Sequence, residues 1–244
     1  MKSLNRIVAI SIRVLTQIAN DTRTVILMVA VPSLLTGLFA WMLNNQKMFD
    51  VVGPRLVGLF PFTVMFLLAS ITTLRERQSG TLERFMTMPM RRYEFIAGYA
   101  ISFGSMAAIQ ALVTLSFAVW VCGLTFKNDF SVLLVAAVAN AVCGMALGLL
   151  ASAFAKSEFQ VIQFMPAFIF PQIILGGLFI PLDQMPDVLH SISDWLPLTH
   201  ALRALSDISA GATLTETYNE IWIVASVSLG ALFLGAITLR KRTP

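Results

Sequence analysis

Six long apolar runs constrain this chain more than any other feature. Each has about the 20 residues that an α-helix needs to cross the hydrocarbon core of a bilayer. They lie at 24–43, 56–74, 99–124, 132–154, 161–180 and 221–239. Charged residues make up only 12% of the 244 residues, whereas a soluble domain has about a quarter. The sequence therefore predicts an all-α polytopic membrane protein with six transmembrane helices in a single domain, 1–244.

Lys and Arg are divided unevenly between the two sides of the expected bundle. The side that carries both termini holds Lys2, Arg6, Arg13, Arg23, Arg75, Arg77, Arg84, Arg91, Arg92, Lys156, Arg240, Lys241 and Arg242. The other side holds Lys47, Arg55, Lys127 and Arg203. Because cytoplasmic loops carry the excess of basic residues, we expect both termini to be cytoplasmic, in a multi-pass protein of a bacterial plasma (inner) membrane. This topology explains the pI of about 9.4 without a nucleic-acid partner.

The N-terminal segment, 1–21, is amphipathic. Lys2, Arg6, Arg13 and Gln17 share one side of a helical wheel, and Leu4, Ile7, Ile10, Val14 and Ile18 share another. This pattern is typical of a helix that lies in the plane of the membrane interface. We prefer that interpretation to an irregular basic tail.

The loop at 75–92, RERQSGTLERFMTMPMRR, separates the second and third runs. Ser79 can cap a helix start, Glu83 suits its first turns, and Pro89 stops it. Leu82, Phe85 and Met86 form a short apolar face. A helix of about two turns is marginal alone in water, so we expect the membrane surface or a partner protein to hold it. A loop that only sets orientation would explain the arginines but not the apolar face.

The fifth run contains Pro166 and Pro171, with Gly176 and Gly177 near its outer end. Prolines remove backbone donors, and irregular backbone at membrane depth occurs where protein or a hydrated cavity satisfies it. We therefore expect a broken or re-entrant fifth segment, and we assign Pro166, Pro171, Gln172, Gly176 and Gly177 to a substrate path or gate. Apolar stripes on either side of Pro197 predict outer amphipathic helices within 181–209.

Small and polar residues inside the runs indicate helix packing. Gly144 and Gly148 form a Gly-x-x-x-Gly pair, a spacing that lets helices approach closely. We favour packing within the subunit over a subunit interface. Cys122 and Cys143 fall inside the expected spans and are interpreted as packing residues rather than as a disulfide or metal pair.

Two stretches resemble the signatures of ABC-2-type transporter permeases. The first is the loop motif, here Ser79, Gly80, Thr81, Leu82, Glu83, Pro89 and Gly98. The second is carried by Gly176, Gly177, Pro181, Leu182, Met185, Pro186, Pro197 and Leu198. Drug-resistance exporters of the daunorubicin type and nodulation-factor exporters are familiar members. The chain departs from the pattern at Gly176, where Ser is common, and at Thr199 and His200, where an aromatic residue is frequent.

The resemblance implies the permease subunit of an ATP-binding cassette exporter that moves an amphipathic, lipid-like or drug-like substrate out of the cytoplasm. It implies that the loop helix is a coupling helix seated on an ATPase subunit, through Ser79, Gly80, Thr81, Leu82, Glu83, Arg84, Phe85 and Pro89. No Gly-x-x-x-x-Gly-Lys-Ser/Thr phosphate loop occurs in the sequence, so ATP and Mg are expected on that partner and no cofactor on this chain. The resemblance also implies a second permease subunit, in a homodimer or heterodimer.

Two other classes of function stay open: an intramembrane enzyme and a non-transporting membrane scaffold. His190 and His200 are the only histidines, and aspartates lie near them in the sequence. No His-Glu-x-x-His or Gly-x-Ser-x-Gly motif is present, so neither a zinc protease nor a serine hydrolase is indicated. We therefore expect a transport subunit that is not itself an enzyme and has no metal site.

Overall fold

The computed structural model describes residues 3–79, 92–213 and 215–238. Within these ranges every regular element is a helix. Six helical segments are long and apolar enough to cross a membrane. The predicted class, an all-α polytopic membrane protein with six spans, is confirmed.

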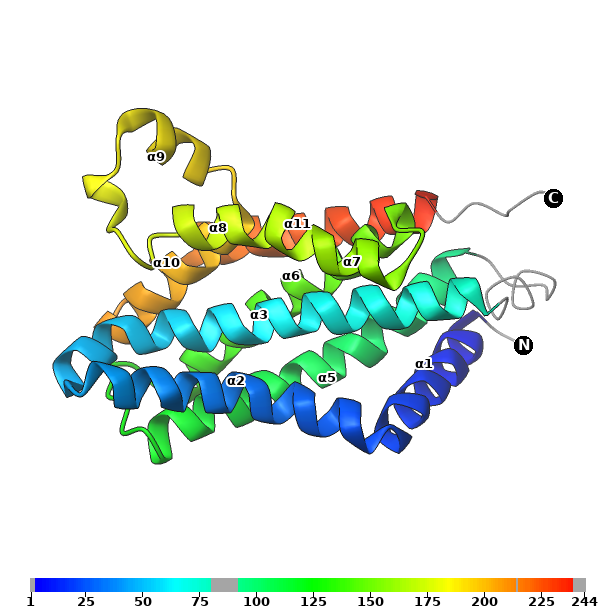
Figure 1. The fold of residues 1–244 in the computed structure, drawn as a ribbon, viewed down its shortest axis with the longest axis horizontal. Coiled ribbons are helices and arrows are strands. Elements are labelled where there is room, and N and C mark those ends of the chain that lie inside the picture. The colour runs from blue at the N-terminus through cyan, green and yellow to red at the C-terminus, as the bar shows by residue number, and fades with distance from the viewer. Residues whose placement is uncertain (1–2, 80–91, 214, 239–244) are drawn as a thin grey trace.

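The spans run alternately between the two ends of an elongated bundle (Figure 1). They are α2 (Thr22–Leu43), α3 (Gln46–Gln78), α5 (Arg92–Trp120), α6 (Phe130–Phe154), the fifth segment at Glu158–Leu175, and α11 (Tyr218–Thr238). Helix α1 (Ser3–Asn20) precedes them. We call the end that carries α1, Ser79 and Thr238 the terminus end. The opposite end, with the α2–α3, α5–α6 and α10–α11 connections, is the far end.

Several helices extend beyond the apolar runs that identify them. Helix α3 covers 33 residues, although its apolar run covers only 56–74. It begins after Asn45, whose side chain accepts a hydrogen bond from the backbone N of Met48 (3.3 Å). Hydropathy detects only the part of a helix that suits lipid, so it misses polar turns beyond the hydrocarbon. Arg55 consequently lies within α3 and not in a loop.

The fifth segment consists of three helical pieces. They are α7 (Glu158–Phe164), a π-helix, η1 (Met165–Ile169), and α8 (Phe170–Leu175). These pieces follow one another without a non-helical residue, so the segment is one helical run with a π-helical stretch, and it runs toward the far end without turning back (Figure 1). It stops at Leu175 instead of 180 because Gly177 adopts a positive φ of 77°, a conformation that ends helices.

Three short helices follow at the far end. They are η2 (Leu182–Gln184), α9 (Asp187–Ser193) and α10 (Pro197–Ala210). Helix α9 is largely exposed and protrudes from the bundle (Figure 1). Helix α10 instead buries Leu198, Leu202, Leu205 and Ile208, and it packs against α3, α6 and α11. Only one of the two helices expected at the outer surface is therefore superficial.

The closest helix pairing in the core is between α3 and α6, which run parallel. A Cβ atom added at Gly144 would lie 2.2 Å from the carbonyl oxygen of Phe62, and one added at Gly148 would lie 2.3 Å from that of Phe66. Asn140 donates from Nδ2 to the Gly58 carbonyl (2.9 Å). The structure thus places both glycines in an intrasubunit contact, where van der Waals packing and hydrogen bonds hold helices together without help from water.

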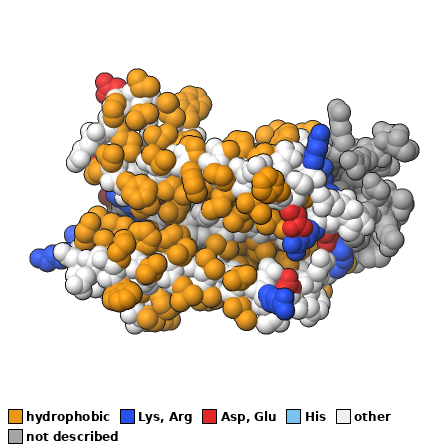
Figure 2. All heavy atoms as spheres, viewed as in Figure 1, with side chains coloured by type: hydrophobic (Ala, Val, Ile, Leu, Met, Phe, Trp, Pro, Cys, Tyr) orange, Lys and Arg blue, Asp and Glu red, His pale blue; other side chains and the backbone are white. Residues whose placement is uncertain are grey.

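Charged and apolar side chains are segregated on the surface. Figure 2 shows hydrophobic side chains over the middle of the molecule and charged ones toward its two ends, with several of them near the terminus end. Large exposed residues include Ile26, Leu34, Phe168, Ile174, Leu229 and Phe233. This distribution is that of a bundle whose sides face lipid, because a soluble protein rarely exposes so continuous an apolar surface.

Alanine at Gly144 should destabilise the protein, because the new methyl group would force the α3 and α6 backbones apart. We expect the unfolding free energy to fall by about 1–3 kcal/mol, measured as a lower thermal midpoint in detergent. Gly230→Ala on α11 is the matched control, since nothing lies within 4 Å of a Cβ there. Equal midpoints for the two variants would contradict the packing assignment.

Candidate functional site

Two buried carboxylates flank residues 80–91, the segment that contains most of the predicted coupling helix. Glu76 lies in the last turns of α3 and is 4% exposed, and Glu94 lies in the first turn of α5 and is 1% exposed. Burying a carboxylate is costly unless a cation or several donors compensate it. Helix α1 supplies those cations.

Glu76 is held by two neighbouring elements. Arg13 of α1 donates from Nη2 to Glu76 Oε1 (3.1 Å). The hydroxyl of Tyr99, a fully buried residue of α5, donates to Glu76 Oε2. Glu76 therefore joins α1, α3 and α5 at one point.

A second set of contacts joins α1 to α5. Arg6 Nη1 lies 3.5 Å from Glu94 Oε2. Ser11 donates to the Gly98 carbonyl (3.1 Å), and Ser102 donates to the Ser11 carbonyl (3.0 Å). A Cβ at Gly98 would lie 2.5 Å from Cγ2 of Ile10, so this glycine is required for the close approach. We call α1 with these partners the α1 anchor.

The end of α3 is also attached to the start of the fifth segment. Arg75 makes two hydrogen bonds with Glu158, Nε to Oε1 (2.7 Å) and Nη2 to Oε2 (3.0 Å). Gln78 donates to the Lys156 carbonyl (2.9 Å), and Arg77 donates to the Ser152 carbonyl. Bidentate arginine–carboxylate pairs are geometrically specific. The last turn of α3 is therefore bound both to α1 and to the α6–α7 connection.

Most residues of the predicted coupling helix lie outside the described part of the chain: Gly80, Thr81, Leu82, Glu83, Arg84, Phe85 and Pro89. Ser79 is described, and it serves as the C-cap of α3. Its backbone N donates to the Arg75 carbonyl (2.9 Å), and its hydroxyl donates to the Glu76 carbonyl (3.2 Å).

The residues predicted to form a gate lie on the fifth segment and the turn after it. Pro166 is in the π-helix, and Pro171 is in the first turn of α8. Gln172 is 8% exposed; it donates from Nε2 to the Phe168 carbonyl (3.0 Å), and its Oε1 accepts from the backbone N of Leu198 (3.4 Å). One amide side chain thus satisfies backbone groups of both the fifth segment and the start of α10.

Gly176 and Gly177 form the turn that leaves α8. A Cβ at Gly176 would lie 2.6 Å from the Gln172 carbonyl oxygen. The φ of 77° at Gly177 is strained for a residue with a side chain, and its carbonyl accepts a hydrogen bond from Arg55 Nη1 (2.7 Å). The two glycines therefore shape the backbone next to α3 and α10.

The two histidines have structural partners. The ring of His200, 6% exposed, contacts the Glu220 carboxylate through Nδ1 and the Asp194 carbonyl through Nε2 (2.8 Å). His190 Nδ1 lies 3.5 Å from Asp194 Oδ2. His200 thereby joins α10 to α11 and to the α9–α10 corner.

Sequence reasoning missed Glu76 and Glu94, the two residues on which the α1 anchor depends. A signal was present in the sequence. Arg6 and Arg13 are seven residues apart, so they share a face of α1. Glu76 and Glu94 each lie just beyond the end of an apolar run, and both of these ends are on the side of the membrane that also carries α1. The helical wheel of this segment was instead interpreted only as that of a helix in the plane of the membrane interface, with no partner assigned to its basic side.

The comparisons with known proteins give a consistent result. The model of the family described as ABC-2 type transporter matches residues 5–209. The chain is 26% identical over 202 residues to "ABC transporter G family member 20" of Dictyostelium discoideum, an alignment that covers 81% of this chain and 28% of that protein. It is 29% identical over 186 residues to "Linearmycin resistance permease protein LnrN" of Bacillus subtilis (strain 168), covering 73% and 48%.

A third relative is "Probable multidrug ABC transporter permease YbhR" of Escherichia coli (strain K12), 24% identical over 172 residues, or 70% of this chain and 47% of the relative. The chain thus aligns with less than half the length of each of these three proteins. The family match, in contrast, covers most of the chain, including α1, five of the six spans and α10. This chain belongs to the ABC-2 type transporter family.

Proposed function

We propose that this chain is the membrane-spanning permease subunit of an ATP-binding cassette exporter. It moves an amphipathic, lipid-like or drug-like substrate outward, using ATP that a separate subunit hydrolyses with Mg. Family membership supports the class of protein. The names of two relatives, a multidrug permease and a linearmycin resistance permease, support the substrate class.

The observation that carries the proposal is the attachment of both ends of the 80–91 segment. On one side, Glu76 and Arg75 tie α3 to α1 and to Glu158 of the fifth segment. On the other side, Glu94 ties α5 to α1. A force applied to the segment by a docked ATPase would therefore reach α1, α3, α5 and the fifth segment together. A loop that only oriented the protein would not need such rigid ends.

In the proposed orientation, the terminus end lies on the cytoplasmic side of a bacterial inner membrane. Arg6, Arg13, Arg75 and Arg77 of the described chain lie at this end, in line with the excess of basic residues on cytoplasmic loops. The ATPase would then approach from the side on which ATP is available. The far end, with α9 and the Gly176–Gly177 turn, would face outward.

The fifth segment is proposed to line or gate the substrate route. Its faces are largely exposed, with Phe159, Ile162, Phe168, Phe170 and Ile174 each at least 49% exposed. A second permease subunit, identical or related, would cover part of such a surface. The π-helix and the Gly176–Gly177 turn are positions at which the segment can change shape.

Phe85→Asp should abolish docking. The substitution places a charge on the apolar face predicted for the 80–91 segment, and recovery of the ATPase with the purified permease should fall by about tenfold or more. Asn20→Asp, which adds the same charge at the exposed end of α1, should leave recovery unchanged. Undiminished recovery and normal substrate-stimulated ATP hydrolysis in Phe85→Asp would contradict the coupling role.

Gln172→Leu should impair transport while the ATPase remains bound. The substitution keeps the apolar volume near α10 but removes two hydrogen bonds, so we expect about a two- to tenfold loss in the export of amphipathic dyes. Gln163→Leu is the matched control, because Gln163 lies on the same segment with its side chain exposed. Equal export rates in the two variants would contradict the gate assignment.

A further inference from the structure

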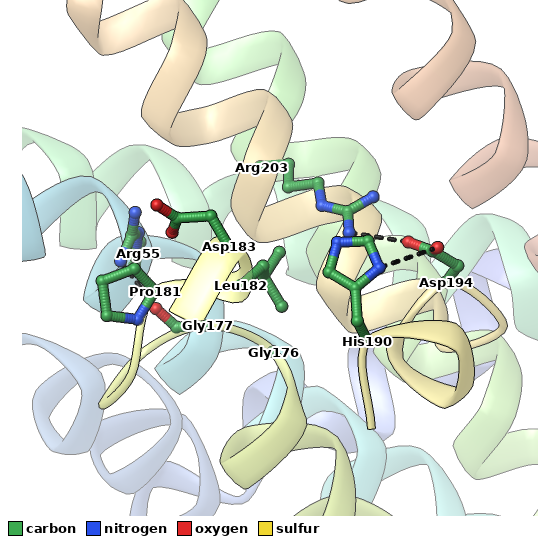
Figure 3. A pocket seen from close by; sticks show the side chains of 9 residues that line it. All are labelled: Arg55, Gly176, Gly177, Pro181, Leu182, Asp183, His190, Asp194 and Arg203. Atoms are coloured by element: carbon green, nitrogen blue, oxygen red, sulfur yellow. Dashed lines mark hydrogen bonds and ion pairs between the residues drawn. The ribbon is translucent and has the colours of Figure 1, made fainter. Parts of the chain in front are cut away.

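A cavity lined by several charged side chains lies at the far end, between α3, α10 and the loop that follows α8 (Figure 3). Its volume is about 490 Å³, within the range of pockets that hold small molecules. Gly176 and Gly177 form one wall, and charged side chains form much of the remainder: Arg55, Asp183, His190, Asp194 and Arg203. Of these side chains only Arg55 comes from a membrane span, and an ionisable residue within a span is a candidate functional residue.

Arg55 is the central cation of this cavity. It projects from α3 between the buried residues Pro54 and Leu56. Its Nε donates to Ser206 Oγ (2.8 Å) and its Nη1 to the Gly177 carbonyl (2.7 Å). Both acceptors are neutral, so these bonds fix the guanidinium without cancelling its charge. Asp207, beside Ser206 on α10, attracts Arg55 only over a longer distance.

The second cation is already neutralised. Arg203 donates from Nη2 to Asp194 Oδ1 (2.7 Å), and His190 contacts the other carboxylate oxygen, as Figure 3 shows by dashed lines. The Arg203 hydrogen bond holds the pKa of Asp194 below its usual value. Arg203 and His190 therefore both pair with the Asp194 carboxylate. Arg55 is the cation of the cavity that is available to a ligand.

Asp183 gives the cavity an available anion. It lies on η2, its side chain is exposed, and it lines the cavity beside Pro181 and Leu182. Among the described residues it makes no side-chain hydrogen bond or ion pair with another group. The cavity thus presents one guanidinium and one carboxylate of opposite charge, a combination that suits a ligand carrying both charges.

Exposed apolar residues precede the lining residues of the cavity in the sequence, Ile174 before Gly176 and Phe179 and Ile180 before Pro181. Ile174 of α8 and Phe179 and Ile180 of the following loop are 60%, 67% and 52% exposed. A hydrocarbon chain could lie against these side chains while a polar headgroup enters the cavity. An amphipathic ligand matches this arrangement better than a small ion does.

We propose that this cavity binds the zwitterionic headgroup of an amphipathic molecule, with its anionic group at Arg55 and its ammonium group at Asp183. The inference rests on the proposed transport function, and it defines the substrate class as a zwitterionic amphiphile held at the outward end of the route. Arg55 and Asp183 are the residues that select it. Gly177 acts as a positioning residue, because its carbonyl fixes the guanidinium.

The test is equilibrium binding of dihexanoyl phosphatidylethanolamine to the purified full chain in a nonionic detergent. Arg55→Gln and Asp183→Asn should each weaken binding by roughly tenfold. The matched controls remove the same charges at the far end but outside the cavity. They are Lys127→Gln and Asp129→Asn, and both should bind within about twofold of the unmodified chain. Asp183→Asn alters an exposed residue, so it tests the site even where Arg55→Gln fails to fold.

Two further probes test the headgroup and the chain separately. Dihexanoyl phosphatidylglycerol, which lacks the ammonium group, should bind weakly, and phosphoethanolamine without acyl chains should bind weakly too. Equal binding of phosphatidylglycerol would overturn the zwitterionic assignment, and equal binding of phosphoethanolamine would overturn the amphiphile. Unchanged binding in both cavity variants would overturn the site. The assay uses neither ATP nor a partner, so its failure is distinguishable from failure of ATPase coupling.

Discussion

The compensation of two buried carboxylates by one helix is the interaction on which the proposed working of this protein depends. Glu76 and Glu94 are almost completely buried at the ends of α3 and α5, and ionised groups there would be strongly unfavourable without Arg13 and Arg6. Helix α1 is therefore bound to the bundle by charge as well as by Ile10, Val14 and Ile18. Its opposite face exposes Leu4, Val8 and Ile12, which suits contact with lipid at the interface.

Helix α3 connects this anchor with the far-end cavity. Its last turn carries Arg75 and Glu76, its middle packs against Gly144 and Gly148 of α6, and its first turns carry Arg55. The tight glycine contact allows little independent movement of α3 and α6, because their backbones already touch. We infer that displacement of the α3 end moves this pair as a unit against the fifth segment and α10. The hydrogen bond between Gln172 and Leu198 of α10 and the one between Arg55 and Gly177 would then change together.

The sequence was sufficient for the class of fold, the six spans and the packing glycines, since hydropathy and small-residue spacing are local properties. It was insufficient to predict which residue of another helix each polar side chain contacts. Arg6 and Arg13 were assigned to the basic face of α1, whereas both contact buried acids of other helices. Helix α10 was expected at the surface because its stripe is amphipathic, but its polar side faces Glu220 of α11 and Arg55 of α3, a pairing between residues far apart in the chain.

The most direct measurement is the coupling of ATP hydrolysis to substrate in a reconstituted complex with Arg13 and Glu76 exchanged. Arg13→Glu and Glu76→Arg should each insert into the membrane yet lose substrate-stimulated hydrolysis, because each places like charges together at the α1 anchor. The double variant restores an opposite pair, so it should recover most of the stimulation. If the double variant stays as uncoupled as the single variants, or if the single variants couple normally, the α1 anchor does not transmit force from the 80–91 segment.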